Sequence, residues 1–199
     1  NLSLDTLRDR AYRMLCFRRD YFDNMYPSSR LKPDEKEAET TCRRVCEAGV
    51  QIVRDRNNLL PFDIAGKKVM HMTVNNNSND NFKYIEEFTA KMREKGADVE
   101  EIRDPGPGVP EDVAQHRKYD LIVCSVMNMP SFGTNIIEIG GLAARNFMCG
   151  WTKYDVPCIF VVHGSPFFHE QYRIFADTVV NTNGNGDYSI EYVMKKIFK

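Results

Sequence analysis

One stretch, residues 118–135 (KYDLIVCSVMNMPSFGTN), constrains the fold more than any other part of the chain. Its apolar run, residues 120–126, begins abruptly after the polar residue Lys118 and is too short to span a membrane. A continuous run rich in Leu, Ile and Val is typical of a strand buried on both faces, as in the middle of a parallel sheet. The run breaks at Asn128 and Pro130, so we expect the strand to lead into a polar loop.

Strand and helix patterns alternate along most of the chain. We expect strands at residues 50–53, 69–74, 99–102, 120–126, 156–162 and 178–181, the third of them near an edge because acidic residues interrupt it. Helical patterns are expected over 82–92, from residue 110, over 136–147 and over 190–198. This alternation predicts an α/β fold, in which a mostly parallel sheet lies between helices on both faces as a three-layer sandwich.

Two further helices are expected before the sheet. Ser3 is placed to cap the first helix, and Asp34 and Glu35 suit the positive end of the second. The first has an apolar stripe of Leu4, Leu7, Ala11, Met14, Leu15 and Phe22. The second has an expected inner stripe of Ala38, Cys42, Val45, Cys46 and Gly49. We therefore divide the chain into a helical segment, residues 1–49, and an α/β domain, residues 50–199.

Composition excludes some classes of function. The formal net charge is -1, without a basic stripe, so we predict no nucleic-acid partner. No apolar run approaches the roughly 20 residues of a membrane helix, so we predict no membrane partner either. The six cysteines are expected to be reduced and structural, because none is spaced with other ligands as in a zinc site. We predict no metal and no cofactor.

Three polar loops follow predicted parallel strands, at residues 75–81, 127–135 and 164–168. Parallel strands place such loops at one edge of the sheet, where α/β proteins bind ligands and partners. An aromatic residue at a loop tip is either a contact for a partner or ligand, or it folds back onto the core. The asparagines either line a polar site or simply connect a strand to a helix. Our candidate residues for a ligand or partner surface are Asn75, Asn77, Ser131, Phe132 and Asn135.

Familiar catalytic motifs are missing from the sequence. No glycine-rich phosphate loop follows the strand at 69–74, and no Gly-x-Ser-x-Gly turn is present. His163 and His169 could share a site, but a histidine pair without a carboxylate partner in the sequence is usually structural.

Several segments together resemble glycoside hydrolase family 3. The segment 13–18 (RMLCFR) is similar to the family's signature on the last barrel helix, and 51–62 (QIVRDRNNLLPF) is similar to the signature after its linking helix. The turn at 164–167 (GSPF) and the closing segments 175–181 and 190–198 are also similar to the family's last strands and helix. The resemblance implies a flavodoxin-like C-terminal α/β sandwich domain, with residues 1–49 as the link from an upstream barrel that is absent here.

The resemblance also implies what this domain does. The family's β-N-acetylglucosaminidases carry their catalytic residues on the barrel, and the signatures for those residues do not occur in this chain, so no catalytic residue is assigned. We expect the domain to support the barrel of a β-N-acetylhexosaminidase in the cytoplasm and to contact carbohydrate only indirectly. The first alternative is a stand-alone flavodoxin-like interaction module without hydrolase activity. A second is a small-molecule enzyme, such as a flavodoxin-like redox protein, that uses the loop after the central strand.

Overall fold

The computed structural model describes residues 3–25, 34–74, 82–106, 108–116, 118–128, 156–165 and 176–199. The chain divides into two compact units, residues Asn1–Glu39 and Thr40–Lys199. The helices of the described residues are α1 (Leu4–Met25), α2 (Glu35–Gly49), α3 (Phe82–Glu94), α4 (Val109–Gln115) and α7 (Asp187–Ile197). Among the described residues no helix is long and apolar enough to cross a membrane.

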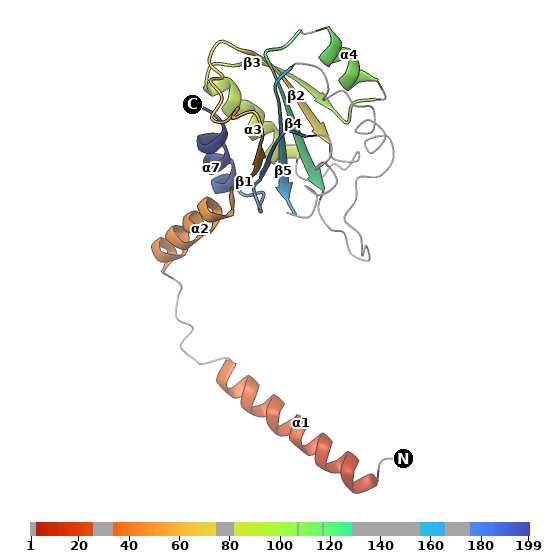
Figure 1. Cartoon of the computed structure of the whole chain (residues 1–199). Coiled ribbons are helices and arrows are strands. Elements are labelled where there is room, and N and C mark those ends of the chain that lie inside the picture. The colour runs from red at the N-terminus through yellow and green to blue at the C-terminus, as the bar shows by residue number, and fades with distance from the viewer. Residues whose placement is uncertain are drawn as a thin grey trace. The chain divides into compact units, whose positions relative to one another are not determined.

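A six-stranded sheet forms the centre of the second unit (Figure 1). Its strands are β1 (Gln51–Asp55), β2 (Lys68–Val74), β3 (Asp98–Arg103), β4 (Leu121–Asn128), β5 (Cys158–Gly164) and β6 (Thr178–Asn181), in the order β1-β6-β5-β4-β2-β3. The strands from β6 to β3 pair in parallel, and β1 pairs antiparallel with β6. The predicted α/β fold is confirmed, with the strand at 120–126 central and the strand at 99–102 at an edge.

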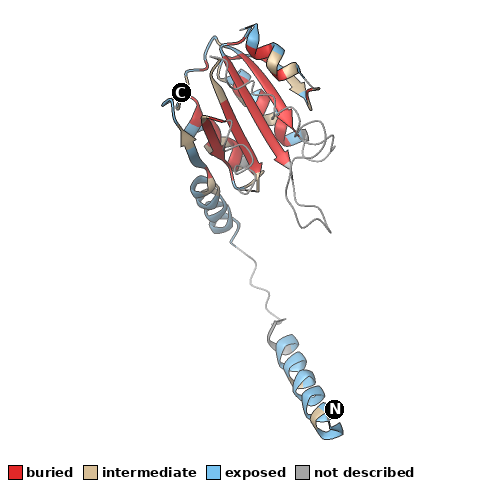
Figure 2. Cartoon of the chain, turned by 45° about the vertical axis from the view of Figure 1, so that its right-hand side comes forward, coloured by how far each residue is buried: buried red, intermediate tan, exposed pale blue. Residues whose placement is uncertain are grey.

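Helices cover the sheet on both faces and bury it between them. One face packs against α3 and α7, and its core includes Val123, Val161 and Phe88. The other face packs against α4 and includes Cys124 and Phe160. Figure 2 shows the central strands as buried over most of their length, with helices on either side. This two-sided burial is why the central strands read as continuous apolar runs in the sequence.

The predicted helix boundaries have visible physical causes. Ser3 caps α1, because its Oγ accepts a hydrogen bond from the backbone N–H of Thr6 at 3.2 Å. Asp34 caps α2 by accepting from the N–H of Lys36 at 2.9 Å. After α3 the chain turns at Gly96, whose φ of 90° lies in the left-handed region that glycine adopts at little cost. The predicted helix at 136–147 lies outside the described residues.

The expected inner stripe of α2 is wrong as a buried core. No residue of this helix is buried, and Val45 is 65% exposed. The described contacts of α2 with α7 are mainly polar, so its apolar side chains are not buried there. Arg43 Nη1 forms an ion pair with Glu191 Oε2 at 3.0 Å, and its guanidinium lies 4.2 Å from the centroid of the Tyr188 ring.

The apolar residues of α1 are exposed as well. Its large exposed side chains are Leu4, Leu7, Tyr12, Met14, Leu15, Phe17, Tyr21 and Phe22. Leu15, for example, is 64% exposed. A helix that presents so many large apolar groups is typical of a surface that packs against another domain or protein.

Candidate functional site

The carboxyl ends of β2, β4 and β5 lie at one edge of the sheet. In register, Val74 of β2 lies beside Val126 of β4, and Asn128 of β4 lies beside Gly164 of β5. Because these strands are parallel, their carboxyl ends meet at one edge, and the segments that follow them leave from that edge. Gly164 has φ 86°, a left-handed conformation that turns the chain sharply where β5 ends.

All five predicted site residues lie outside the described residues. Asn75 and Asn77 follow β2, and Ser131, Phe132 and Asn135 follow β4. Their role in contacting a ligand or partner therefore stays a prediction. What the structure does describe is the set of side chains on the strands that lead to these segments.

Thr73, one residue before the end of β2, carries a buried hydroxyl near this edge. Its Oγ1 has no hydrogen-bond partner among the described residues. Leaving a buried hydroxyl without a hydrogen-bond partner costs free energy of folding. Thr73 is in register with Ser125 of β4, which belongs to a second polar feature.

That second feature is a continuous set of hydrogen bonds within the α3-covered side of the core. We call it the imidazole network, and its members are Glu101, Thr89, His71, Ser125, His163 and Tyr84. Ser125 Oγ lies at its centre, 2.8 Å from His71 Nε2 and 3.1 Å from His163 Nε2. All but Glu101 are buried.

The outer contacts of the imidazole network reach α3 and β3. His71 Nδ1 lies 2.8 Å from Thr89 Oγ1, which in turn donates to Glu101 Oε2 at 3.1 Å. At the other end, His163 Nδ1 lies 3.2 Å from the hydroxyl of Tyr84. The network thus links β3, β2, β4 and β5 to the helix α3.

Burial keeps both imidazoles neutral. It lowers the pKa of His71 to about 3, with smaller contributions from the positive charges of Arg93 and Arg103. Burial also lowers the pKa of His163 to about 3, and the nearby His71 lowers it further. Burial raises the pKa of the Tyr84 hydroxyl, so this group is protonated as well. Catalytic sites also combine serine with histidine, but here the serine and both histidines are buried.

Most of this network was not predicted from the sequence. The candidate partner of His163 was His169, which lies outside the described residues, whereas the structure links His163 to His71 through Ser125. The sequence did contain one signal of the network. His71, Ser125 and His163 are polar residues on the same face of three otherwise apolar strands. Alternation along a strand assigns such residues to one face, but it does not reveal which helix they meet.

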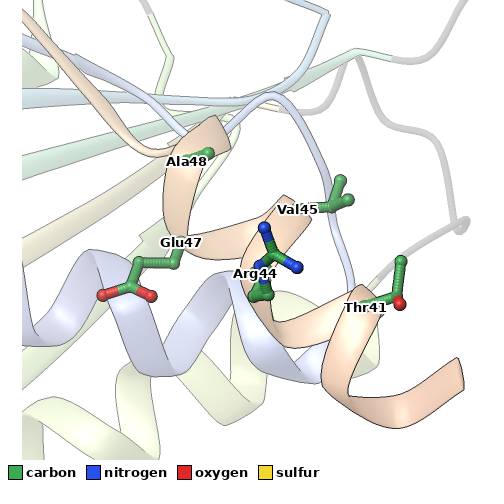
Figure 3. Close-up of a pocket in the computed structure, with 5 residues that line it drawn as sticks. All are labelled: Thr41, Arg44, Val45, Glu47 and Ala48. Atoms are coloured by element: carbon green, nitrogen blue, oxygen red, sulfur yellow. The ribbon is translucent and has the colours of Figure 1, made fainter. Parts of the chain in front are cut away.

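Other described residues offer no stronger site. No group of three His, Cys, Asp or Glu side chains in the described ranges could hold a metal ion. A surface hollow is lined by Thr41, Arg44, Val45, Glu47 and Ala48 (Figure 3). Because all five belong to α2, the described lining is one exposed helix and contains no pair of groups placed for catalysis.

Known proteins of similar structure clarify the fold. No family model and no curated protein sequence matches the chain. A fungal multi-domain GH3 β-N-acetylglucosaminidase superposes with a TM-score of 0.67 at 16% identity, covering 99% of this chain and 22% of the other. The β-glucoside phosphorylase BglX gives a TM-score of 0.62 at 19% identity, covering 80% and 29%.

A β-glucosidase from Listeria innocua, solved with isofagomine, gives a TM-score of 0.59 at 15% identity and covers 97% of this chain and 31% of its own. The chain therefore spans between about a fifth and a third of these longer neighbours. At such low identities the likeness establishes the fold. This protein thus has the fold of an α/β segment found in larger carbohydrate-active enzymes, glycosidases among them.

Proposed function

We propose that this chain is the C-terminal α/β domain of a glycoside hydrolase, and that it supports an active site on an upstream barrel of the same parent chain. The proposed parent is a β-N-acetylhexosaminidase of glycoside hydrolase family 3. The observation that carries the proposal is the match to the fungal GH3 β-N-acetylglucosaminidase, which extends over 99% of this chain. In this proposal residues 1–49 are the link and residues 50–199 the domain.

The chemistry of the described strand ends agrees with a supporting role. Most glycoside hydrolases place two carboxyl groups on either side of the bond that they cleave. The described strands β2, β4 and β5 end in Val74, Asn128 and Gly164, none of which is acidic. We therefore propose that the domain is catalytically incomplete alone and meets carbohydrate only through the edge that it presents to the barrel.

The exposed apolar residues of α1 support the barrel as partner. Leu4, Leu7 and Leu15 lie on one side of the helix at helical spacing, and all three are exposed. We propose that this side packs on the upstream domain in the parent. A cytoplasmic location completes the proposal, because the five described cysteines, Cys16, Cys42, Cys46, Cys124 and Cys158, are free thiols and suit a reducing compartment.

The alternative of a stand-alone interaction module agrees with the same structure. The unit Thr40–Lys199 packs helices on both faces of its own sheet and so closes a core without help from an upstream domain. Both hypotheses predict a folded domain, but only the first predicts a catalytic barrel before Asn1.

The test compares the parent chain with the present 199 residues. Under the hydrolase hypothesis the upstream sequence encodes a barrel of about 200 residues or more. The parent then hydrolyses an aryl N-acetylglucosaminide, and the 199-residue chain does not. An upstream sequence without a barrel, or a parent without activity on aryl glycosides, would leave the interaction module as the function.

A substitution tests the proposed edge within that parent. Phe132→Ala should raise KM of the parent or weaken docking of the domain, while the melting temperature of the 199-residue chain barely changes. Phe132→Leu, which keeps an apolar side chain, is the matched control. A large loss of stability in the 199-residue chain would instead make Phe132 a core residue.

A further inference from the structure

The hydrogens of the imidazole network can be assigned from its contacts. Thr89 has one hydroxyl hydrogen and three possible acceptors, Nδ1 of His71 at 2.8 Å and Glu101 Oε2 and the carbonyl of Ile85 at 3.1 Å each. Arg103 Nε, 2.6 Å from Glu101 Oε1, holds that carboxylate as a charged acceptor. Because a charged carboxylate makes the stronger hydrogen bond, Thr89 donates to Glu101, and its Oγ1 accepts from the Nδ1–H of His71.

The remaining directions follow one from another. With its hydrogen on Nδ1, the neutral ring of His71 accepts at Nε2, so Ser125 donates to it over 2.8 Å. Ser125 then accepts from the Nε2–H of His163. His163 accepts at Nδ1 from the hydroxyl of Tyr84. The geometry thus gives each histidine one tautomer, and the two tautomers differ.

Helix α3 is the element that depends on both rings. Thr89 and Tyr84, which bond to the two outer imidazole nitrogens, both belong to α3. Phe88, also on α3, lies against both rings, with centroid distances of 5.6 Å to His71 and 5.4 Å to His163. Three side chains in six residues of one helix therefore meet the two buried imidazoles.

We propose that the imidazole network is an acid-sensitive lock that holds α3 on the sheet. A proton from solvent added to Nε2 of His71 would face the hydroxyl hydrogen of Ser125, so two hydrogens would lie between the same two atoms. A proton added to Nδ1 of His163 would face the hydroxyl hydrogen of Tyr84 in the same way. Each ring can therefore be protonated in place only if the facing hydroxyl turns its hydrogen away, which costs the hydrogen bond at that nitrogen.

The charges around the rings act in the same direction. Arg93 at the end of α3 and Arg103 on β3 both disfavour a positive charge on His71, and His71 disfavours one on His163. Glu101, the acidic member of the network, is 16% exposed and already pairs with Arg103. The elements packed around the rings thus provide little negative charge to stabilise an imidazolium. Acid therefore favours the opened state, in which solvent hydrates the rings.

Two measurements on the intact 199-residue chain test the lock. Long-range ¹H–¹⁵N correlation spectra at neutral pH should give the Nδ1–H tautomer for His71 and the Nε2–H tautomer for His163. Hydrogen exchange, corrected for the intrinsic rate, should lose protection in α3 by about 25-fold for each ring released between pH 7 and pH 5, since an exposed imidazole titrates near 6.5. The protection of α7, which also covers this face, should change less than that of α3.

Substitutions supply the controls. His116, at the C-terminal cap of α4, is exposed, so His116→Gln should leave the protection of α3 unchanged at both pH values. Ser125→Ala should remove the single-tautomer signature of His163, because its Nε2–H loses its acceptor, whereas His71 keeps its Nδ1–H on Thr89. The lock is wrong if both histidines share one tautomer, if either ring titrates near 6.5 as an exposed imidazole does, or if α3 and α7 lose protection equally. The spectra of the unsubstituted chain test the proposed lock even if Ser125→Ala does not fold.

Discussion

Asp55 of β1 and Thr178 of β6 lie opposite each other in the antiparallel pair, and Thr178 Oγ1 donates to Asp55 Oδ1 at 3.1 Å. The same carboxylate accepts from the N–H groups of Leu59 at 2.9 Å and Leu60 at 3.0 Å. One side chain therefore joins the two strands and also orders the turn that leads out of β1.

Removing that carboxylate should destabilise the domain. We expect Asp55→Ala to lower the free energy of unfolding by about 1–3 kcal/mol, because it leaves two part-buried N–H groups and one hydroxyl without their acceptor. Asp63→Ala is the control, since Asp63 accepts one exposed bond from Ala65 at 3.3 Å and should cost under about 0.5 kcal/mol. Urea unfolding followed by circular dichroism measures both. Equal losses in the two variants would contradict this role for Asp55.

Acid should destabilise the whole domain through its buried histidines. Folding lowers the pKa of His71 and His163 to about 3, from the usual 6.5, so between these values the unfolded chain binds more protons than the folded one. This contribution to stability is therefore present above pH 6.5 and is lost progressively as the pH falls toward 3. The slope should reach about 1.4 kcal/mol per pH unit for each histidine. Urea unfolding between pH 4.5 and 7 measures it, and a flat profile in a chain that stays folded would rule it out.

Truncating Phe88 should be among the costliest single changes in the core. Its ring is fully buried and packs against both imidazoles, so Phe88→Ala should cost about 3–5 kcal/mol. Val45→Ala on α2 is the matched truncation at an exposed apolar position and should stay within about 0.5 kcal/mol. Thermal unfolding of both variants distinguishes them. A similar shift for Val45→Ala would mean that the exposed side of α2 is covered in solution.

The isolated chain should hydrolyse neither aryl N-acetylglucosaminides nor aryl glucosides. The expectation follows from the missing family signatures and from the non-acidic residues that end the described strands. The measurement is release of the aryl group by purified protein, against a mock purification from cells without the chain. Activity that co-purifies with the chain and is absent from the mock preparation would overturn the supporting role.

The sequence predicted the central layers of this fold best. Residues 121–126 form a buried strand because both faces of the sheet are covered, and this leaves a continuous apolar run that is easy to recognise. The antiparallel pairing of β1 was not predicted. Its partner is β6, more than 120 residues away, and nothing local in residues 51–55 indicates an antiparallel neighbour.

The polar interior was harder to predict than the apolar layers. His71 lies in the run VMHMTV, where a strand pattern continues through it and gives no sign of a partner. Its contacts come from Thr89, 18 residues later, and Ser125, 54 residues later. Such a network is set by how α3 lies on the sheet, which periodicity does not encode. The predicted edge could be located because parallel strands share a direction, whereas its candidate side chains remain predictions.

The pairing of β1 with β6 also determines when this edge of the sheet can form during biosynthesis. Asp55 leaves the ribosome 123 residues before Thr178. At about 5–20 residues per second, β1 then waits roughly 6–25 seconds for its partner strand to be made. During that interval the apolar Ile52 and Val53 have no β6 beside them, so the nascent chain carries an unpaired strand. The sheet can therefore close at this edge only after residues 178–181 have been made.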